Sequence, residues 1–171
     1  MEDKKRPRGR PPKHRVPVSK ESYAYAKKIS KQYADLKDEV ELFERKMKSL
    51  VRLLKARSVK GFPLALGVDE RYKDYPLSDE DKSRMMAYID AKEKVYLVEK
   101  GIGQMEEGEW KEIAKDQILA GIPARGVTKL HNISDSKRDR AIREAVYQIA
   151  VWYDIVSDWN ARKTGKMGVG P

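Results

Sequence analysis

The sequence predicts an all-α protein, and three observations carry that prediction. Apolar residues recur at alternating steps of three and four residues from Ala26 to Leu54 and again from Tyr88 to Met105, which is the period of a helix seam. From Glu109 onward, shorter helical patterns are separated by Gly, Pro and Asn, which favour turns. Residues 61–77 mix Gly, Pro and scattered aromatics without a sustained period, which is typical of a connector between helices. We therefore expect long heptad-patterned helices followed by short ones.

A basic arm precedes the helical pattern. The chain has 171 residues and a formal net charge of +10, and residues 1–18 contain seven Lys or Arg against two acids, a net +5. A segment with this charge and so few large apolar side chains cannot offset its ordering entropy. We expect residues 1–18 to be a disordered arm. The excess of cations favours an anionic partner, with nucleic acid first.

The arm contains the stretch KRPRGRPPK. Its prolines keep the backbone extended, and its glycine permits close approach to a surface. A slender cationic segment suits the narrow, strongly negative minor groove of A·T-rich DNA. The PRGRP core resembles an AT-hook, although a generic basic tail, which would also bind phosphate, is the alternative. The expected minor-groove residues are Lys5, Arg6, Arg8, Gly9, Arg10, Lys13 and Arg15.

Residues 19–107 predict two long helices joined by a connector. No Pro or Gly interrupts residues 18–60, so a single helix of about 40 Å or more is expected there, with a connector at 61–77. Ser78, followed by three acidic residues, predicts the N-cap of the second helix. Three arrangements of the two seams fit this pattern: a coiled-coil hairpin within the chain, a bundle core, or a spacer between two chains. We expect a homo-oligomer, with a dimer favoured.

Residues 108–158 predict three helices, at 109–119, 124–131 and 134–157. Pro123 separates the first two, Asn132 and Ile133 make a tight link, and Ser134 is the expected N-cap of the third. We expect Trp110, Ile113, Ile118 and Leu119 to give the first helix its apolar face, and Val127 and Leu130 to face inward from the second.

The third of these helices divides into an apolar side and a basic side. The apolar side contains Ile142, Ala145, Ile149 and Trp152. A recognition helix needs this division, because the core must hold it while its first turns enter the major groove. We therefore predict a helix-turn-helix at residues 108–158, with a bundle carrying a basic face as the alternative. The expected DNA contacts are Ser136, Lys137, Arg140 and Arg143.

The segment HNISDSKRDRAIREAVYQIA resembles the last helix-turn-helix of sigma-factor region four. It is more similar to the RinA and ArpU-like late transcriptional regulators of bacteriophages, over roughly residues 85–155. The resemblance implies a phage-encoded transcriptional regulator that works in the cytoplasm of a bacterial host and contacts host RNA polymerase. Arg138 departs from the pattern, because sigma-like helices often carry a small or apolar residue there.

Several other functions are not indicated. The chain has no Cys and two His, so disulfides, thiolate nucleophiles and Cys-based zinc sites are excluded. No catalytic motif is present, and we expect neither an enzyme nor a cofactor or metal; His131 is expected at a helix end or on the surface. No apolar run approaches a membrane span. The rival function is a small terminase subunit or an architectural protein for viral DNA packaging. Residues 159–171 are expected to be a flexible tail.

Overall fold

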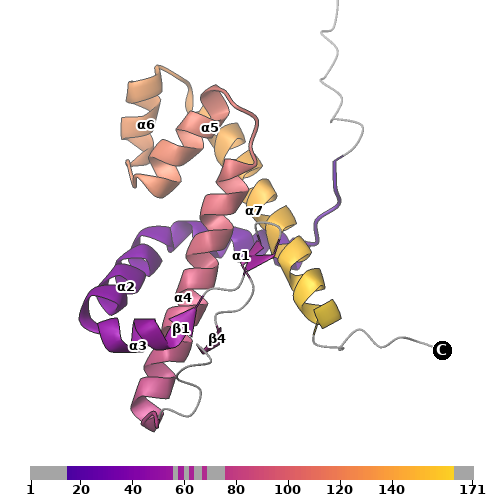
Figure 1. Ribbon diagram of the computed structural model, residues 1–171. Helices are drawn as coiled ribbons and strands as arrows, with labels where there is room; N and C mark the ends of the chain where they lie inside the picture. The colour runs from indigo at the N-terminus through magenta and orange to yellow at the C-terminus, as the bar shows by residue number, and fades with distance from the viewer. Residues whose placement is uncertain (1–14, 56–57, 60–61, 64–66, 69–75, 164–171) are drawn as a thin grey trace, which may run out of the picture.

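The computed structural model describes residues 15–55, 58–59, 62–63, 67–68 and 76–163, and it is all-α as predicted (Figure 1). Two antiparallel pairs of two-residue strands begin before the connector expected at 61–77: Leu54–Lys55 pairs with Gly67–Val68, and Ser58–Val59 pairs with Phe62–Pro63. The helices are α1 Lys20–Lys31, α2 Tyr33–Lys46, α3 Lys48–Leu53, α4 Asp79–Gly103, α5 Glu109–Ala114, the π-helical turn η2 Lys115–Leu119, α6 Ala124–His131 and α7 Asp135–Lys163. The strands are β1 Leu54–Lys55, β2 Ser58–Val59, β3 Phe62–Pro63 and β4 Gly67–Val68.

The prediction of a single long helix before the connector is wrong. The helix breaks at Gln32 and again at Met47, whose backbone leaves the helical region at φ −112° and ψ 42°, and the last helical segment ends at Leu53. The reason is tertiary packing: α1 lies against α7, whereas α2 lies against α4. The bend between them in Figure 1 lets one seam follow two partners that point in different directions.

The heptad seam of α1 and α2 is buried within the chain. Ile29, Tyr33 and Val40 are all buried, and the ring of Phe43 stacks on that of Tyr88 with centroids 4.4 Å apart. In the described part of the chain, the seam is therefore bundle core, and it does not offer the apolar stripe that a coiled coil between two chains needs.

The second long helix begins as predicted. The Oγ atom of Ser78 accepts a hydrogen bond from the backbone N–H of Asp81 at 3.1 Å, and the predicted seam is buried along the helix. Near its end α4 crosses α7 at Gly101, where an added Cβ would lie only 2.5 Å from the Cα of Ile149. The missing side chain lets the two backbones come into contact.

One core joins the two halves of the chain. Val98 and Ile102 of α4 belong to the same buried cluster as Ala145 and Ile149 of α7. Side chains from both sides of the boundary expected at residue 108 therefore share one buried cluster. α7 also continues to Lys163, so the tail expected from residue 159 begins as helix, since no Gly or Pro lies between Asp135 and Gly165. Residues 164–171 lie outside the described residues.

Candidate nucleic-acid interface

Three C-terminal helices pack around a small apolar centre of their own. Ile113 of α5, Val127 of α6 and Ala141 of α7 are each 0% exposed, and Ile122 and Ile133 pack against them. Each helix thus contributes one fully buried side chain to the contact. This centre fixes the position of the first turns of α7 relative to α5 and α6.

The link between α6 and α7 has the predicted tight geometry. Asn132 ends α6 in the left-handed region at φ 50° and ψ 53°, a conformation that Asn tolerates better than most residues. The Oγ atom of Ser134 accepts a hydrogen bond from the backbone N–H of Lys137 at 3.2 Å. The cap predicted for the third helix is therefore present, and α7 begins directly after the turn.

Two side chains that were expected to face the core are exposed. Leu130 is 63% exposed and Trp110 is 41% exposed. In α6 the inward position one turn after Val127 belongs to His131, whose Nε2 lies 2.6 Å from Oδ2 of Asp116 in η2, so Leu130 faces solvent. His131 does lie at a helix end, as expected. In α5 the inward positions belong to Ile113 and Ala114.

An exposed polar stripe runs along the first turns of α7. Ser136, Arg140 and Arg143 follow one another at steps of four and three, so they share one face of the helix. All three are exposed, and neither arginine has an ion-pair partner among the described residues. We call these three residues the α7 stripe. Its donors are free to meet a partner.

Lys137 and Arg138 lie beside the α7 stripe and are engaged. The Nζ atom of Lys137 is 2.5 Å from Oε2 of Glu109, which ties α7 to α5. The guanidinium of Arg138, whose side chain is 14% exposed, pairs with Asp135 at 2.9 Å and with Asp139 at 2.8 Å. Arg138, which departs from the sigma-like pattern, is thus neutralised by two carboxylates on its own helix.

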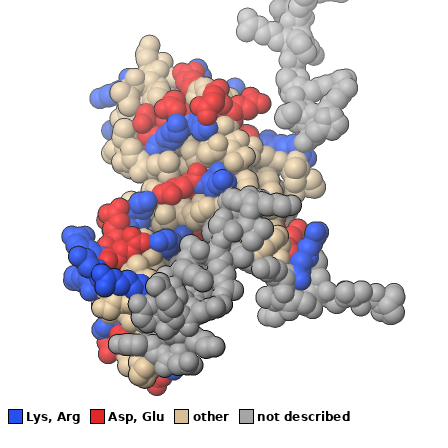
Figure 2. All heavy atoms as spheres, in the orientation of Figure 1, with Lys and Arg blue, Asp and Glu red and all other residues tan. Residues whose placement is uncertain are grey.

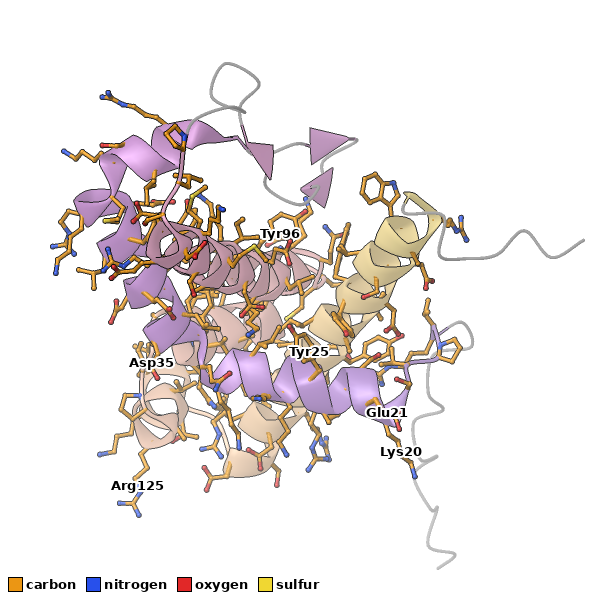
Figure 3. The ribbon with its side chains drawn as sticks, turned by 90° about the horizontal axis from the view of Figure 1, so that it is seen from below. Lys20, Glu21, Tyr25, Asp35, Tyr96 and Arg125 are labelled. Atoms are coloured by element: carbon orange, nitrogen blue, oxygen red, sulfur yellow. The ribbon has the colours of Figure 1, made fainter. Side chains whose placement is uncertain are left out.

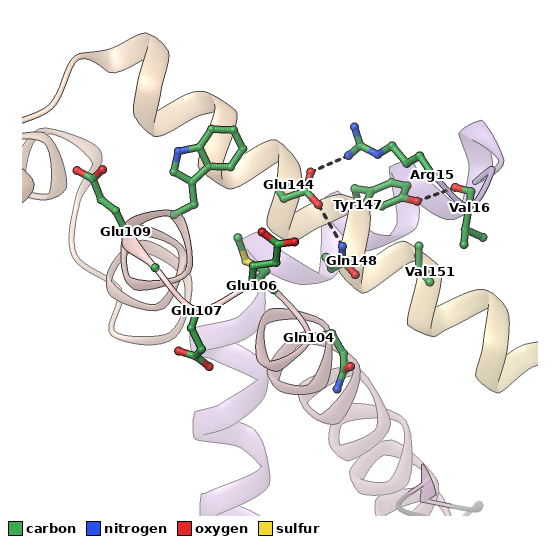
Figure 4. A pocket seen from close by; sticks show the side chains of 13 residues that line it. Arg15, Val16, Gln104, Glu106, Glu107, Glu109, Glu144, Tyr147, Gln148 and Val151 are labelled. Carbon is green, nitrogen blue, oxygen red and sulfur yellow. Dashed lines mark hydrogen bonds and ion pairs between the residues drawn. The ribbon is translucent and has the colours of Figure 1, made fainter. Parts of the chain in front are cut away.

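The root of the basic arm is fastened to the same helix (Figure 4). The guanidinium of Arg15 lies 2.8 Å from Oε2 of Glu144 and 3.8 Å from the centroid of the Tyr147 ring. The hydroxyl of Tyr147 donates a hydrogen bond to the carbonyl of Val16 at 2.7 Å. Tyr147 follows Arg143 by four residues, so the arm leaves the body one helical turn beyond the α7 stripe.

The sequence assigned Arg15 to phosphate contacts, whereas its guanidinium is held within the chain. It lies at the edge of a cavity of about 760 Å³ between α7 and the segment joining α4 to α5. The exposed Trp110 and Glu106 also line this cavity. The remaining predicted arm residues lie outside the described residues; they are Lys5, Arg6, Arg8, Gly9, Arg10 and Lys13.

A second group of cations lies at the other end of the molecule. Figure 2 shows Lys and Arg side chains gathered where α2 ends and α3 begins, with Asp and Glu side chains directly beside them. Arg45 and Lys46 are in the last turn of α2, and Arg52 is in α3. The sequence predicts that such charges are ordinary solvated helix surface. Only the fold shows that these cations lie close together.

Comparisons of the chain with protein-family models, curated proteins and solved structures find no match. Among the described residues, no group of three or more His, Asp or Glu side chains is placed to hold a metal ion. Within the same residues, no helix combines the length and apolarity needed to cross a membrane.

Proposed function

We propose that this protein binds double-stranded DNA sequence-specifically, with α7 in the major groove as the recognition helix of a helix-turn-helix formed by α5, α6 and α7. Arginine can donate two hydrogen bonds to guanine, and serine can meet a base or a phosphate. Ser136, Arg140 and Arg143 are the residues that would make these contacts. Lys137 joins them only after leaving Glu109, so it is a weaker candidate than the sequence indicated.

One observation carries the proposal: the α7 stripe and the root of the basic arm lie on consecutive turns of one helix. Arg140 and Arg143 are exposed without ion-pair partners in the described part of the chain, and Tyr147 holds Val16 one turn later. A protein that reads the major groove with α7 would therefore deliver its arm to the adjacent minor groove. Homeodomains combine a recognition helix with a basic arm in this way.

The AT-hook resemblance supports the placement of the basic arm in the minor groove. Arg8 and Arg10 would lie along the floor of an A·T-rich minor groove, and the flanking cations would release counterions from phosphates. The resulting affinity depends strongly on salt. A phage transcriptional regulator that contacts host RNA polymerase is the biological role that the resemblance to RinA and ArpU-like proteins favours.

Binding of labelled duplexes by the wild-type protein and by Arg140→Ala tests the central proposal. If Arg140 reads a base, its loss should cost about 1–3 kcal/mol at the preferred site and less elsewhere. Arg45→Ala, which removes an exposed arginine of α2, is the matched control and should leave sequence preference unchanged. Absence of measurable duplex binding in dilute salt would refute the proposal.

The arm is tested separately with A·T-rich and G·C-rich duplexes. Arg8→Ala/Arg10→Ala should weaken binding chiefly to A·T-rich DNA, because only that minor groove is narrow and strongly negative. An equal loss on both duplexes would indicate a generic basic tail in place of a hook.

Oligomeric state discriminates between regulation and DNA packaging. The seam that suggested dimerisation is buried within the chain, so a dimer would have to use other apolar side chains, such as Leu42 at 43% exposure or Met86 at 66%. We propose a low-order homo-oligomer, as expected of a regulator on a short site. Light scattering after size-exclusion chromatography measures it, and a closed ring of many copies would favour a terminase subunit.

A further inference from the structure

A groove beside α7 gathers positive charge from two helices that are far apart in sequence. It lies between α1, η2 and α7, has a volume of about 410 Å³, and is lined by Lys27, Lys31 and Arg143. These three side chains are exposed, and none has an ion-pair partner among the described residues. Asp139 also lines the groove, but its carboxylate already pairs with Arg138 at 2.8 Å. We call it the α1–α7 groove.

Charge makes the α1–α7 groove different from an ordinary solvated helix face. Lysines usually occur on helix surfaces next to acids that they can pair with. Here Lys27 and Lys31 are one turn apart on α1, where like charges oppose each other, and Arg143 adds a third cation from α7. An anion bound among them would relieve this repulsion.

The rest of the groove lining is mainly apolar, and in the described structure one of its buried polar atoms lacks a partner. The Oε1 atom of Gln117 in η2 is buried with no hydrogen-bond partner in the described structure. Because a DNA phosphate also offers only acceptors, this oxygen cannot hydrogen-bond it, and a contact from Gln117 would have to come from its Nε2 donor. The other side chains that form this lining are Tyr23, Ser30, Ala34, Ile118, Ile142 and Val146.

We propose that the α1–α7 groove holds a phosphate of the DNA backbone beside the bases that α7 reads. This inference rests on the proposed function and adds Lys27 and Lys31 to its contacts. Phosphate needs only positive charge and hydrogen-bond donors, which lysine and arginine provide. The sequence did not indicate these lysines, because residues 27 and 143 meet only in the folded chain.

The position of α1 relative to α7 fits this role. Arg143 belongs both to the α7 stripe and to the groove, so the groove lies next to the face of α7 that would meet the bases. Figure 3 shows α1 lying across α7, where the rings of Tyr25 and Tyr153 are 4.5 Å apart. When one helix lies in the major groove, a helix packed across it meets the phosphates at the groove's edge.

The chain contains a closely matched control. Lys28 follows Lys27 on α1 and is also exposed, but it does not line the groove. Replacement of either lysine by alanine removes one charge from the same helix and favours helix formation slightly. Any difference in DNA binding between the two variants therefore reflects the position of the lysine relative to the groove. Circular dichroism of each variant verifies the fold.

The salt dependence of binding to a mixed-sequence duplex is the decisive measurement. The slope of log K against log salt is negative, and each lost phosphate contact reduces its magnitude by about 0.9. We therefore expect this change for Lys27→Ala and for Lys31→Ala, and about 1.8 for the double variant if the contacts add. Lys28→Ala should keep the wild-type slope. The loss of affinity should be the same for different sequences, since phosphate contacts carry no sequence information.

The possible failures are distinguishable. If Lys27→Ala behaves as Lys28→Ala does while Arg140→Ala still weakens binding, the groove does not hold a phosphate and the proposed function stands. A loss at Lys27 that depends on the base sequence would also overturn the phosphate assignment. If the wild-type protein binds no duplex in dilute salt, both the proposed function and the groove fail together.

Discussion

The guanidinium of Arg15 lies over the ring of Tyr147, 3.8 Å from its centroid, although the two residues are separated by 132 positions in the sequence. The same arginine pairs with Glu144. A cation over an aromatic ring and an ion pair that is only partly exposed each contribute modestly to stability. Together with the hydrogen bond from Tyr147 to the carbonyl of Val16, they fix where the arm leaves the body.

Replacement of Tyr147 should release this root. Tyr147→Leu removes both the ring and the hydroxyl, and we expect it to increase the rate of trypsin cleavage after Arg15 several-fold while cleavage after Lys13 stays unchanged. Tyr147→Phe keeps the ring and loses only the hydrogen bond, so its effect should be intermediate. Mass spectrometry of a short digestion measures both sites. Equal cleavage rates after Arg15 in all three proteins would mean that the ring does not hold the arm.

The crossing of α4 and α7 depends on the missing side chain of Gly101. A Cβ at this position would lie 2.5 Å from the Cα and 2.7 Å from the backbone nitrogen of Ile149, and backbone atoms cannot move aside cheaply. Gly101→Ala should therefore lower the free energy of unfolding by roughly 1–3 kcal/mol through overpacking.

Gly103→Ala is the control, since nothing lies within 4 Å of its added Cβ. This variant should be neutral or stabilised by up to about 1 kcal/mol, because alanine favours the helix. Urea denaturation measures both variants. Equal stability of Gly101→Ala and wild type would show that the helices separate at this crossing without cost.

The sequence predicted the helices more reliably than their partners. Heptad spacing identified Ile29, Tyr33 and Val40 as apolar seam, and these residues are buried. The break at Gln32 was not predicted, because no Pro or Gly marks it and it arises from packing α1 and α2 on different helices. A period reports which face of a helix is apolar, whereas the identity of its partner is a property of the whole fold.

The same distinction between local pattern and tertiary contact applies to the candidate site. Local rules predicted the cap at Ser134 and the exposed positions of Ser136, Arg140 and Arg143, since capping and helix periodicity depend on near neighbours. They did not predict that Glu109 would pair with Lys137, or that Lys27 would line a groove with Arg143. Such contacts join residues far apart in sequence, so a single sequence gives no signal for them.

Acid should weaken the contact between α2 and α4. Glu44 accepts hydrogen bonds from Nζ of Lys92 at 2.6 Å and from the hydroxyl of Tyr88 at 2.7 Å, and the hydrogen bond from Lys92 is the main reason that the pKa of Glu44 is lowered. A carboxyl whose pKa is lower in the folded state stabilises the protein above its unfolded pKa of 4.5, and this contribution is lost as pH falls through the folded pKa.

Glu44→Gln measures that contribution. At neutral pH the variant should be less stable by up to about 1 kcal/mol, a small value because the pair is partly exposed and screened by solvent. The difference from wild type should shrink as the pH falls below 4.5, since the wild-type carboxyl is then increasingly protonated. Thermal unfolding over a pH series measures it, and a difference that is constant with pH would contradict the ionic origin.

Removal of the unpaired acceptor of Gln117 should stabilise the protein. Its Oε1 atom is buried without a partner in the described structure, and such a group costs about 1–3 kcal/mol. Gln117→Met keeps the length of the side chain and removes both polar atoms, so we expect a gain of about 1 kcal/mol in the free energy of unfolding. Gln148→Met is the control: Gln148 donates to Glu144 at 3.1 Å, and its replacement should not stabilise. A loss of stability in Gln117→Met would instead mean that water satisfies the amide, and that this wall of the groove is hydrated in the free protein.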